Sequence, residues 1–180
     1  MATPRTVLTD AQLMELPKDG RKYELVDGEV QVVPAGRRHG RVTVKLVSRL
    51  DPYVDDKRLG MVFDSSTGFR MPSGNVRAPD LSFVATTPVP AGDIPPGFGE
   101  SVPDLAVEVL SPDDDGRKVL DKVGEYLAAG ARLVWVIDPE RRCAVAYRSV
   151  SQTRQIGEDD FLDGEDVVPG FRLRLGDLFS

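Results

Sequence analysis

The fold is decided by one stretch, Pro103-Asp104-Leu105-Ala106-Val107-Glu108-Val109-Leu110-Ser111-Pro112. It predicts a buried strand that carries a carboxylate, Glu108, in the middle of an apolar run. A charge without a partner is costly to bury, so Glu108 needs a proton, a cation or a metal ion beside it. The stretch therefore predicts both a central strand and a chemical site on that strand.

A second stretch, Pro79-Asp80-Leu81-Ser82-Phe83-Val84, repeats the Pro-Asp-Leu phrase and predicts another core strand. Asp104 and Glu108 are too far apart on one strand to share a cation, roughly 13 Å at about 3.3 Å per residue. We therefore interpret Asp104 as a strand-start residue. Asp80 can supply the second carboxylate if the two strands are neighbours, although a plain strand-start role is the alternative. Two such oxygen ligands, completed by water, suit Mg²⁺ or Mn²⁺.

The segment after the central strand predicts a helix over residues 113–129, which Gly130 ends. The apolar side chains of this helix fall on one arc, and Lys122 lies at the border of that arc. A lysine at such a border can lay its stem on apolar surface and bring its ammonium to Glu108. The alternative is that Lys122 only covers apolar surface while its charge stays in water.

The remaining patterns complete an α/β fold with a mixed sheet. Residues 23–26 and 29–33, separated by Asp27-Gly28, predict an N-terminal β-hairpin. Residues 38–53 have helical apolar spacing, and residues 132–138 and 143–149 predict a buried strand with its hairpin partner. We expect a single domain over residues 1–180, with a core of about 9–150 and a tail, 151–180, docked on it.

Three further residues are candidate supporting members of the site. His39 is the only histidine and follows two arginines at the start of a predicted helix. It could contact phosphate or a metal-bound water, or it could be a surface cap. Glu24 and Glu29 alternate with apolar residues in the hairpin, so either could reach the site or lie on a polar face. Tyr126 and Trp135 are interpreted as core residues.

The charge balance limits the class of partner. The net charge is −6 and the pI about 4.9, which count against a broad basic surface for nucleic acid. They do not exclude a nuclease, because acids gathered at a metal site lower the net charge. The basic residues between positions 37 and 49 are interpreted as solvated surface, with phosphate binding as the alternative.

The counts of cysteine and histidine and the hydropathy of the chain argue against a disulfide-bonded protein, a structural zinc site and a membrane protein. With one cysteine and one histidine, the chain can form no internal disulfide and no structural zinc site. No run approaches the roughly 18 apolar residues of a membrane helix. The first residues lack an apolar core after a basic start, so we expect no secretory signal, no membrane partner and a cytoplasmic protein.

Taken in order, several phrases of the chain resemble the Uma-type family of restriction-endonuclease-like proteins, within the PD-(D/E)xK nuclease superfamily. The similarity covers about residues 9–179. The matching phrases are Tyr23-Glu24-Leu25-Val26-Asp27-Gly28-Glu29, His39, Ala78-Pro79-Asp80-Leu81, residues 103–112, Lys122, Tyr126, Gly130, residues 133–139 and Val168-Pro169-Gly170-Phe171.

This resemblance implies a restriction-endonuclease-like mixed sheet flanked by helices, with Asp80 and Glu108 as metal ligands. The superfamily lysine normally stands two residues after the second acid, where this chain has Leu110. The resemblance places that lysine on the following helix, at Lys122. Glu24 and His39 match family positions and are carried over as supporting members.

We therefore predict a Mg²⁺- or Mn²⁺-dependent endonuclease that hydrolyses DNA, with Asp80, Glu108 and Lys122 as catalytic residues. Cutting both strands of a duplex would favour a homodimer. A second hypothesis is a catalytically idle nuclease fold that serves as a binding or assembly module, which the acidic pI favours. Hydrolysis of RNA or nucleotides at the same site stays open, because no base-reading motif is present.

Overall fold

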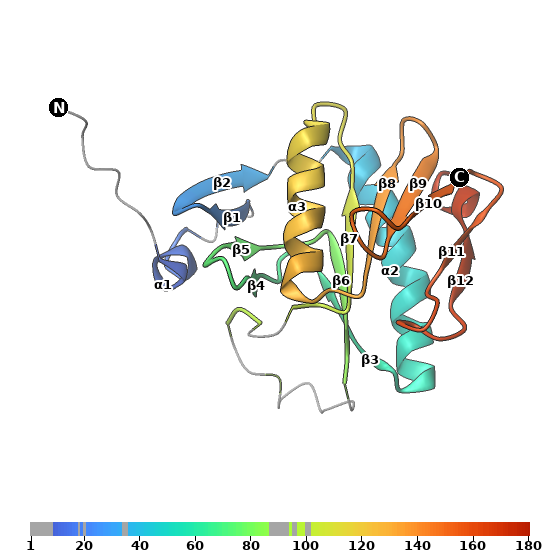
Figure 1. Cartoon of the computed structure of the whole chain (residues 1–180), viewed down its shortest axis with the longest axis horizontal. Coiled ribbons are helices and arrows are strands. Elements are labelled where there is room, and N and C mark those ends of the chain that lie inside the picture. The colour runs from blue at the N-terminus through green and yellow to red at the C-terminus, as the bar shows by residue number, and fades with distance from the viewer. Residues whose placement is uncertain are drawn as a thin grey trace.

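A six-stranded mixed sheet lies at the centre of the molecule, in the order β10-β9-β8-β7-β6-β3 (Figure 1). The computed structural model describes residues 9–17, 19, 21–33, 36–86, 94, 97–99 and 102–180. The strands are β3 (Gly60–Asp64), β6 (Leu81–Ala85), β7 (Leu105–Val109), β8 (Leu133–Asp138), β9 (Cys143–Tyr147) and β10 (Thr153–Ile156). Only β7 and β8 pair in parallel, and the other neighbours are antiparallel. The predicted mixed sheet is therefore confirmed.

The strand predicted from residues 103–112 is β7, and it is buried along its whole length. Its side chains alternate between two apolar clusters, because successive residues of a strand point to opposite faces of the sheet. Leu105, Val107 and Val109 pack with α2 (Arg37–Lys57), whereas Ala106 packs with α3 (Gly116–Ala129). The two long helices thus cover opposite faces of the sheet, α3 in front and α2 behind in Figure 1.

Helix α3 follows β7 and returns the chain to β8 alongside it. The helix begins three positions later than predicted, because the Asp115 side chain caps it by accepting a hydrogen bond from Arg117 N at 2.9 Å. It ends where predicted, at Gly130, whose φ of 116° is favourable only for glycine. This crossover sets the position of Lys122 over the carboxyl end of β7.

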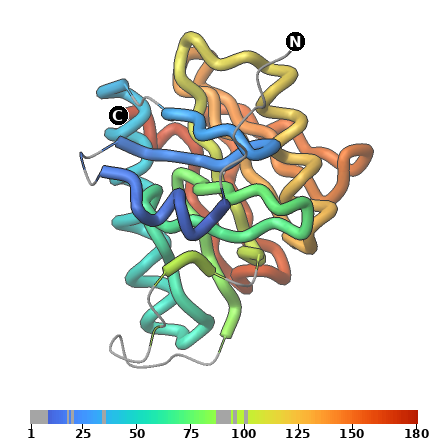
Figure 2. The backbone as a smooth tube through the Cα atoms, turned by 90° about the vertical axis from the view of Figure 1, so that its left-hand side faces the viewer, coloured from blue at the N-terminus to red at the C-terminus, as the bar shows by residue number. Residues whose placement is uncertain are grey.

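A smaller sheet, in the order β2-β1-β5-β4, packs beside the central one. It contains the predicted hairpin, β1 (Lys22–Val26) and β2 (Glu29–Val33), together with β4 (Phe69–Arg70) and β5 (Val76–Arg77). Asp27 and Gly28 have φ of 51° and 78°, as the tight turn between paired strands requires. The short helix α1 (Asp10–Met14) precedes this sheet. Figure 2 shows the hairpin lying across one side of the molecule, between the α2 and α3 regions.

The C-terminal segment contributes apolar side chains, among them Leu162 and Val168, to the larger core cluster. Strands β11 (Phe161–Asp163) and β12 (Arg172–Arg174) pair with each other, and a short 3₁₀ helix, η2 (Leu175–Leu178), follows. Phe171 stacks on the buried core residue Trp135, with ring centroids 6.3 Å apart. The division of the chain into one domain stays a prediction. The expectation of no secretory signal concerns residues 1–6, which lie outside the described residues.

In the part of the chain that the structure describes, no helix combines the length and the apolar character that crossing a bilayer requires.

Replacing Leu50 by Ala tests the packing between α2 and the sheet. Leu50 is fully buried in the cluster shared with β7. We expect the free energy of unfolding to fall by about 2–5 kcal/mol, because lost burial and a residual cavity both destabilise the fold. Urea denaturation followed by circular dichroism measures this. The same change at exposed Val44 is the control and should cost well under about 1 kcal/mol.

Candidate active site

Asp80 lies directly before β6, beside the part of β7 that carries Glu108. Its backbone N–H donates to Val107 O at 2.9 Å, and its Oδ2 accepts from Val109 N at 2.8 Å. Asp80 is thus hydrogen-bonded to the residues on both sides of Glu108. The Asp80 side chain is 4 % exposed, and His39 Nε2 lies 2.8 Å from its Oδ2. The start of α2 therefore contacts the site through His39.

Glu108 projects from β7 toward α3 and is held there by two side chains. Lys122 Nζ lies 2.9 Å from Glu108 Oε1 and 2.9 Å from Oε2. The hydroxyl of Tyr126, one helical turn further along α3, donates to Oε1 at 2.8 Å. Because Tyr126 is fully buried, its hydroxyl leaves Glu108 little freedom to rotate. Lys122 therefore supplies the cation that the buried Glu108 requires.

Glu24 brings a third buried carboxylate from β1. Its Oε1 accepts from Lys122 Nζ at 2.8 Å and from Ala78 N at 3.0 Å, and its Oε2 lies 3.3 Å from Arg77. Arg77 also donates to Glu125 on α3 at 2.6 Å. Lys122 is consequently shared between Glu24 and Glu108, and the hairpin is tied to α3 through charged side chains.

Lys22 is a further cation of the site. Its Nζ lies 2.7 Å from Asp80 Oδ1, and its side chain is only 13 % exposed. Lys22 and Glu24 stand two positions apart on β1 and so share one face of the strand. Both oxygens of Asp80 therefore have donors, Lys22 on Oδ1 and His39 with Val109 N on Oδ2.

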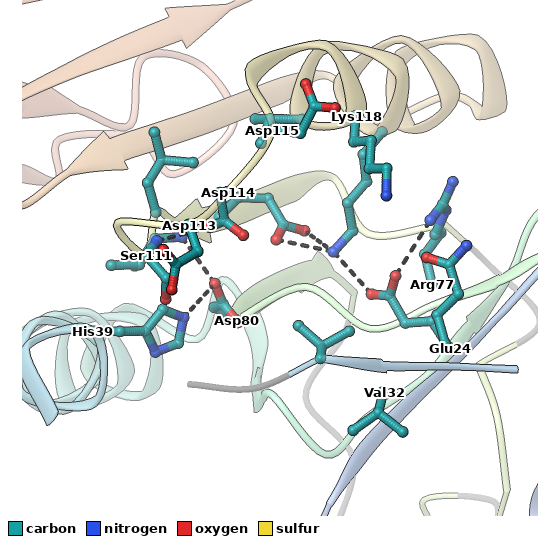
Figure 3. Close-up of a pocket in the computed structure, with 17 residues that line it drawn as sticks. Glu24, Val32, His39, Arg77, Asp80, Ser111, Asp113, Asp114, Asp115 and Lys118 are labelled. Carbon is teal, nitrogen blue, oxygen red and sulfur yellow. Dashed lines mark hydrogen bonds and ion pairs between the residues drawn. The ribbon is translucent and has the colours of Figure 1, made fainter. Parts of the chain in front are cut away.

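A cavity of about 250 Å³ lies between the hairpin, the start of α2 and the start of α3, and it is lined by Glu24, His39, Arg77, Asp80, Glu108 and Lys122 among others. Figure 3 shows Asp80 with His39 on one side and with Glu24 and Arg77 on the other. Asp113, Asp114 and Asp115 line the α3 side, together with Lys118. In the described ranges, no three His, Cys, Asp or Glu side chains form a group suited to a metal ion. A cation bound here would need backbone or water ligands beside Asp80 and Glu108.

The pKa values of Asp80 and Glu108 are shifted in opposite directions by their surroundings. Burial acts against the charged form of Asp80, but the hydrogen bond from His39 and the charge of Lys22 outweigh it and lower its pKa well below the usual value. The pKa of Glu108 is raised, chiefly by burial and also by the charge of Asp80. Lys122 lies between two carboxylates, and despite its burial their charges raise its pKa. Asp80 is therefore a persistent anion, whereas the negative charge of Glu108 depends on the neighbouring charge of Lys122.

The structure brings five of the six candidate residues together. Asp80, Glu108, Lys122, Glu24 and His39 all line the cavity. Glu29 is exposed beside the hairpin turn, and it is not among the residues that line the cavity. It pairs with Val26 at the end of the ladder remote from Lys22, so the strand carries it away from the other acids.

Sequence reasoning missed three residues that contact these acids: Lys22, Arg77 and Tyr126. Lys22 had an available indication, because the residue two positions before Glu24 must share its strand face. Tyr126 is in the core as predicted, but its hydroxyl binds Glu108. A buried tyrosine usually needs a partner for its hydroxyl, which was the overlooked indication. Arg77 carries no local pattern that points to Glu24.

Comparisons with known proteins agree with this architecture. The model of the Uma2 family, described as "putative restriction endonuclease", matches residues 10–176. A crystal structure of a "putative nuclease" of DUF820 from Anabaena variabilis superposes with a TM-score of 0.82 at 22 % identity, covering 96 % of this chain and 97 % of that one. No curated protein matches. The fold is therefore that of a nuclease-like protein with a mixed sheet.

Because the family model spans nearly all of the sequence, the chain belongs to the Uma2 family.

Proposed function

We propose that this chain is a divalent-metal-dependent endonuclease that hydrolyses phosphodiester bonds of DNA. The observation that carries the proposal is the meeting of Asp80, Glu108 and Lys122 at one cavity, although they come from three different elements. Carboxylates in a cavity whose pKa values are shifted by burial and by a specific charged partner are candidates for a functional site. The family description and the nuclease-like neighbour support the same reaction class.

The donor set fits Mg²⁺ or Mn²⁺ rather than a softer metal. Asp80 and Glu108 would hold the ion with carboxylate oxygens, and the Val109 backbone carbonyl at the same cavity would be a further ligand. Hard divalent cations prefer such oxygen ligands and keep several waters. A bound divalent cation would lower the pKa of a ligand water and stabilise charge on the phosphate.

The protein groups have separate roles in this proposal. Lys122 would orient the attacking water or offset charge at the scissile phosphate. Tyr126 and Glu24 are positioning residues, because they contact Glu108 and Lys122. His39 would hold Asp80 in place from the first turn of α2. Arg77 would keep Glu24 in place through its second carboxylate oxygen.

A plasmid-cleavage assay tests the proposal. Purified wild-type chain should nick or linearise supercoiled plasmid in Mn²⁺ or Mg²⁺, and EDTA should stop the reaction. The Glu108→Gln chain, purified in parallel, controls for a contaminating nuclease and should leave the plasmid intact. Equal cleavage by the two preparations would contradict the proposal. Substituting RNA for plasmid tests whether the site prefers the other nucleic acid.

Removing the charge of Lys22 should change the affinity for the metal. A divalent cation at Asp80 competes with the Lys22 ammonium for Oδ1, so Lys22→Met should bind Mn²⁺ about tenfold more tightly. Isothermal titration calorimetry measures the dissociation constant. Lys22→Arg keeps the charge and should resemble the wild type. An unchanged dissociation constant in Lys22→Met would show that Lys22 and the metal do not compete.

The second candidate function is an idle nuclease fold that binds or assembles without cutting. The observation that favours it is that both oxygens of Asp80 already have protein donors. An idle site would show no Mn²⁺ binding that depends on Asp80, even at millimolar metal. Calorimetry on wild type and Asp80→Asn therefore separates the two functions without relying on cleavage.

A further inference from the structure

A groove runs away from the catalytic cavity along the start of α2. The catalytic cavity shares His39, Leu110 and Ser111 with a second hollow of about 260 Å³. This second hollow shares Arg38, Pro139 and Glu140 with a third one of about 330 Å³. The three hollows therefore adjoin one another along the start of α2, and we call the second and third together the α2 groove.

Most of the charged side chains that line the α2 groove are arginines. Arg37, Arg38, Arg41 and Arg142 line it, against the single carboxylate side chain of Glu140. Arg38 pairs with Glu140, and Arg142 pairs with Glu158 while lying over the Phe179 ring. Among the described residues, the structure gives no acidic partner to Arg37 or Arg41. The α2 groove thus has a cationic surplus in a protein whose net charge is −6.

The position of these arginines on α2 is unfavourable for the helix itself. The first turn of α2 holds no acidic residue, and its N-cap, Gly36, makes no side-chain capping bond. The partial positive charge of a helix N-terminus favours anions and disfavours cations. Arg37 and Arg38 therefore add to a positive field that a bound anion would relieve, and phosphate is well suited to such a place.

The part of the catalytic cavity at the start of α3 is mainly acidic. Asp113, Asp114 and Asp115 line the cavity along the start of α3. In Figure 3, Asp115 lies beside Lys118 at the start of α3, whereas Asp113 lies nearer to Ser111 and His39. At the start of α3 the three aspartates outnumber the one lysine, Lys118, so a polyanion that reaches Asp80 meets a more favourable charge balance along the α2 groove. Charge therefore favours one direction of approach.

We propose that the α2 groove is the track for the phosphate backbone of the nucleic-acid strand whose scissile phosphate enters the catalytic cavity. This inference rests on the proposed nuclease function, which it deepens by assigning the path of the substrate. Arg37, Arg38 and Arg41 contact phosphates, so they supply affinity without reading sequence. Ser180 lines the third hollow, where its Oγ accepts a hydrogen bond from Lys45 Nζ at 2.7 Å.

The test measures binding of a fluorescein-labelled DNA duplex by anisotropy, in EDTA so that nothing is cut, over a range of salt concentrations. The groove variant is Arg37→Gln/Arg38→Gln/Arg41→Gln. The matched control, Arg49→Gln/Lys57→Gln/Arg58→Gln, removes the same charge from exposed residues further along α2 and at its C-terminal end. Circular dichroism and a thermal melt check that both variants keep the wild-type fold.

We expect the groove variant to bind at least about tenfold more weakly than wild type, with the control within about twofold. The logarithm of the association constant falls linearly with the logarithm of the salt concentration, with a slope of about 0.9 for each neutralised phosphate. Because the groove variant loses three arginines, this slope should become shallower by about 2–3. A second variant, Arg37→Glu/Arg41→Glu, leaves the Arg38–Glu140 pair intact and should bind more weakly still. Wild-type affinity and slope in both groove variants, or an equal weakening in the control, would overturn the track.

Failure of the track and failure of the nuclease function are distinguishable. If wild type cuts plasmid in Mn²⁺ and the groove variant cuts with the same KM, the track alone is overturned. If wild type neither cuts plasmid nor binds the duplex, in EDTA or in Ca²⁺, the nuclease function and the track fall together. A higher KM with little change in kcat in the groove variant supports the track.

Discussion

Replacing Asp80 by Asn is expected to abolish both metal binding and cleavage. Asp80 is a persistent anion held by Lys22, His39 and Val109 N, and the neutral amide removes its charge while nearly keeping its shape. Loss of the charge should lower the cleavage rate by at least about a thousandfold. Plasmid cleavage measures the rate, and calorimetry with Mn²⁺ measures binding independently of the reaction.

The chain supplies a matched control for this change in the second Pro-Asp-Leu phrase. Asp104 accepts a hydrogen bond from Ala85 N at 2.8 Å and lies outside the catalytic cavity. Asp104→Asn should therefore keep wild-type cleavage and wild-type Mn²⁺ binding. Full activity in Asp80→Asn, or an equal loss in Asp104→Asn, would remove Asp80 from the proposed site.

Replacing Lys122 by Met is expected to destabilise the protein as well as inactivate it. Lys122 is the cation shared by Glu24 and Glu108, and its side chain is 12 % exposed. Without it, two buried carboxylates lose their nearest charge partner, and breaking a buried ion pair costs about 3–5 kcal/mol. Urea denaturation measures the free energy of unfolding. The cleavage rate should fall by about 10²–10⁴ because water loses its orienting group.

Two variants separate this effect from a general loss of charge. Lys118 lies one helical turn before Lys122 and lines the same cavity, but it contacts neither Glu24 nor Glu108, so Lys118→Met should cost less than about 1 kcal/mol. Adding Glu24→Gln to Lys122→Met removes one of the two stranded carboxylates and should restore part of the stability. If Lys122→Met unfolds at the wild-type urea concentration, the buried ion pairs contribute little and this account of the site is wrong.

Much of the architecture could be predicted because its signals are local. Strand β7 is an apolar run bounded by prolines, the hairpin turns at Asp27-Gly28, and α3 ends at Gly130. Each depends on backbone preferences or side-chain periodicity over a few neighbouring residues. The start of α3 was placed too early, since three consecutive aspartates all suit a cap and only Asp115 makes the capping bond.

The site was predictable where burial alone demanded a partner. A carboxylate inside β7 had to have a cation, and Lys122 was within reach at the border of the α3 arc. Glu29 shows the limit of such reasoning. It shares the alternation that singled out Glu24, but the hairpin register places it at the turn, away from the cavity.

The sequence by itself determined the strands, the helices and the two acids most in need of partners, because short-range periodicity and the cost of burying charge act wherever the chain folds. Only the tertiary structure decided that Lys22 and Arg77 also pair with acids of the site. Lys22 reaches Asp80 across 58 positions, and Arg77 reaches Glu24 across 53. Contacts over such separations depend on how the hairpin docks against the central sheet, and no pattern of neighbouring residues predicts that docking.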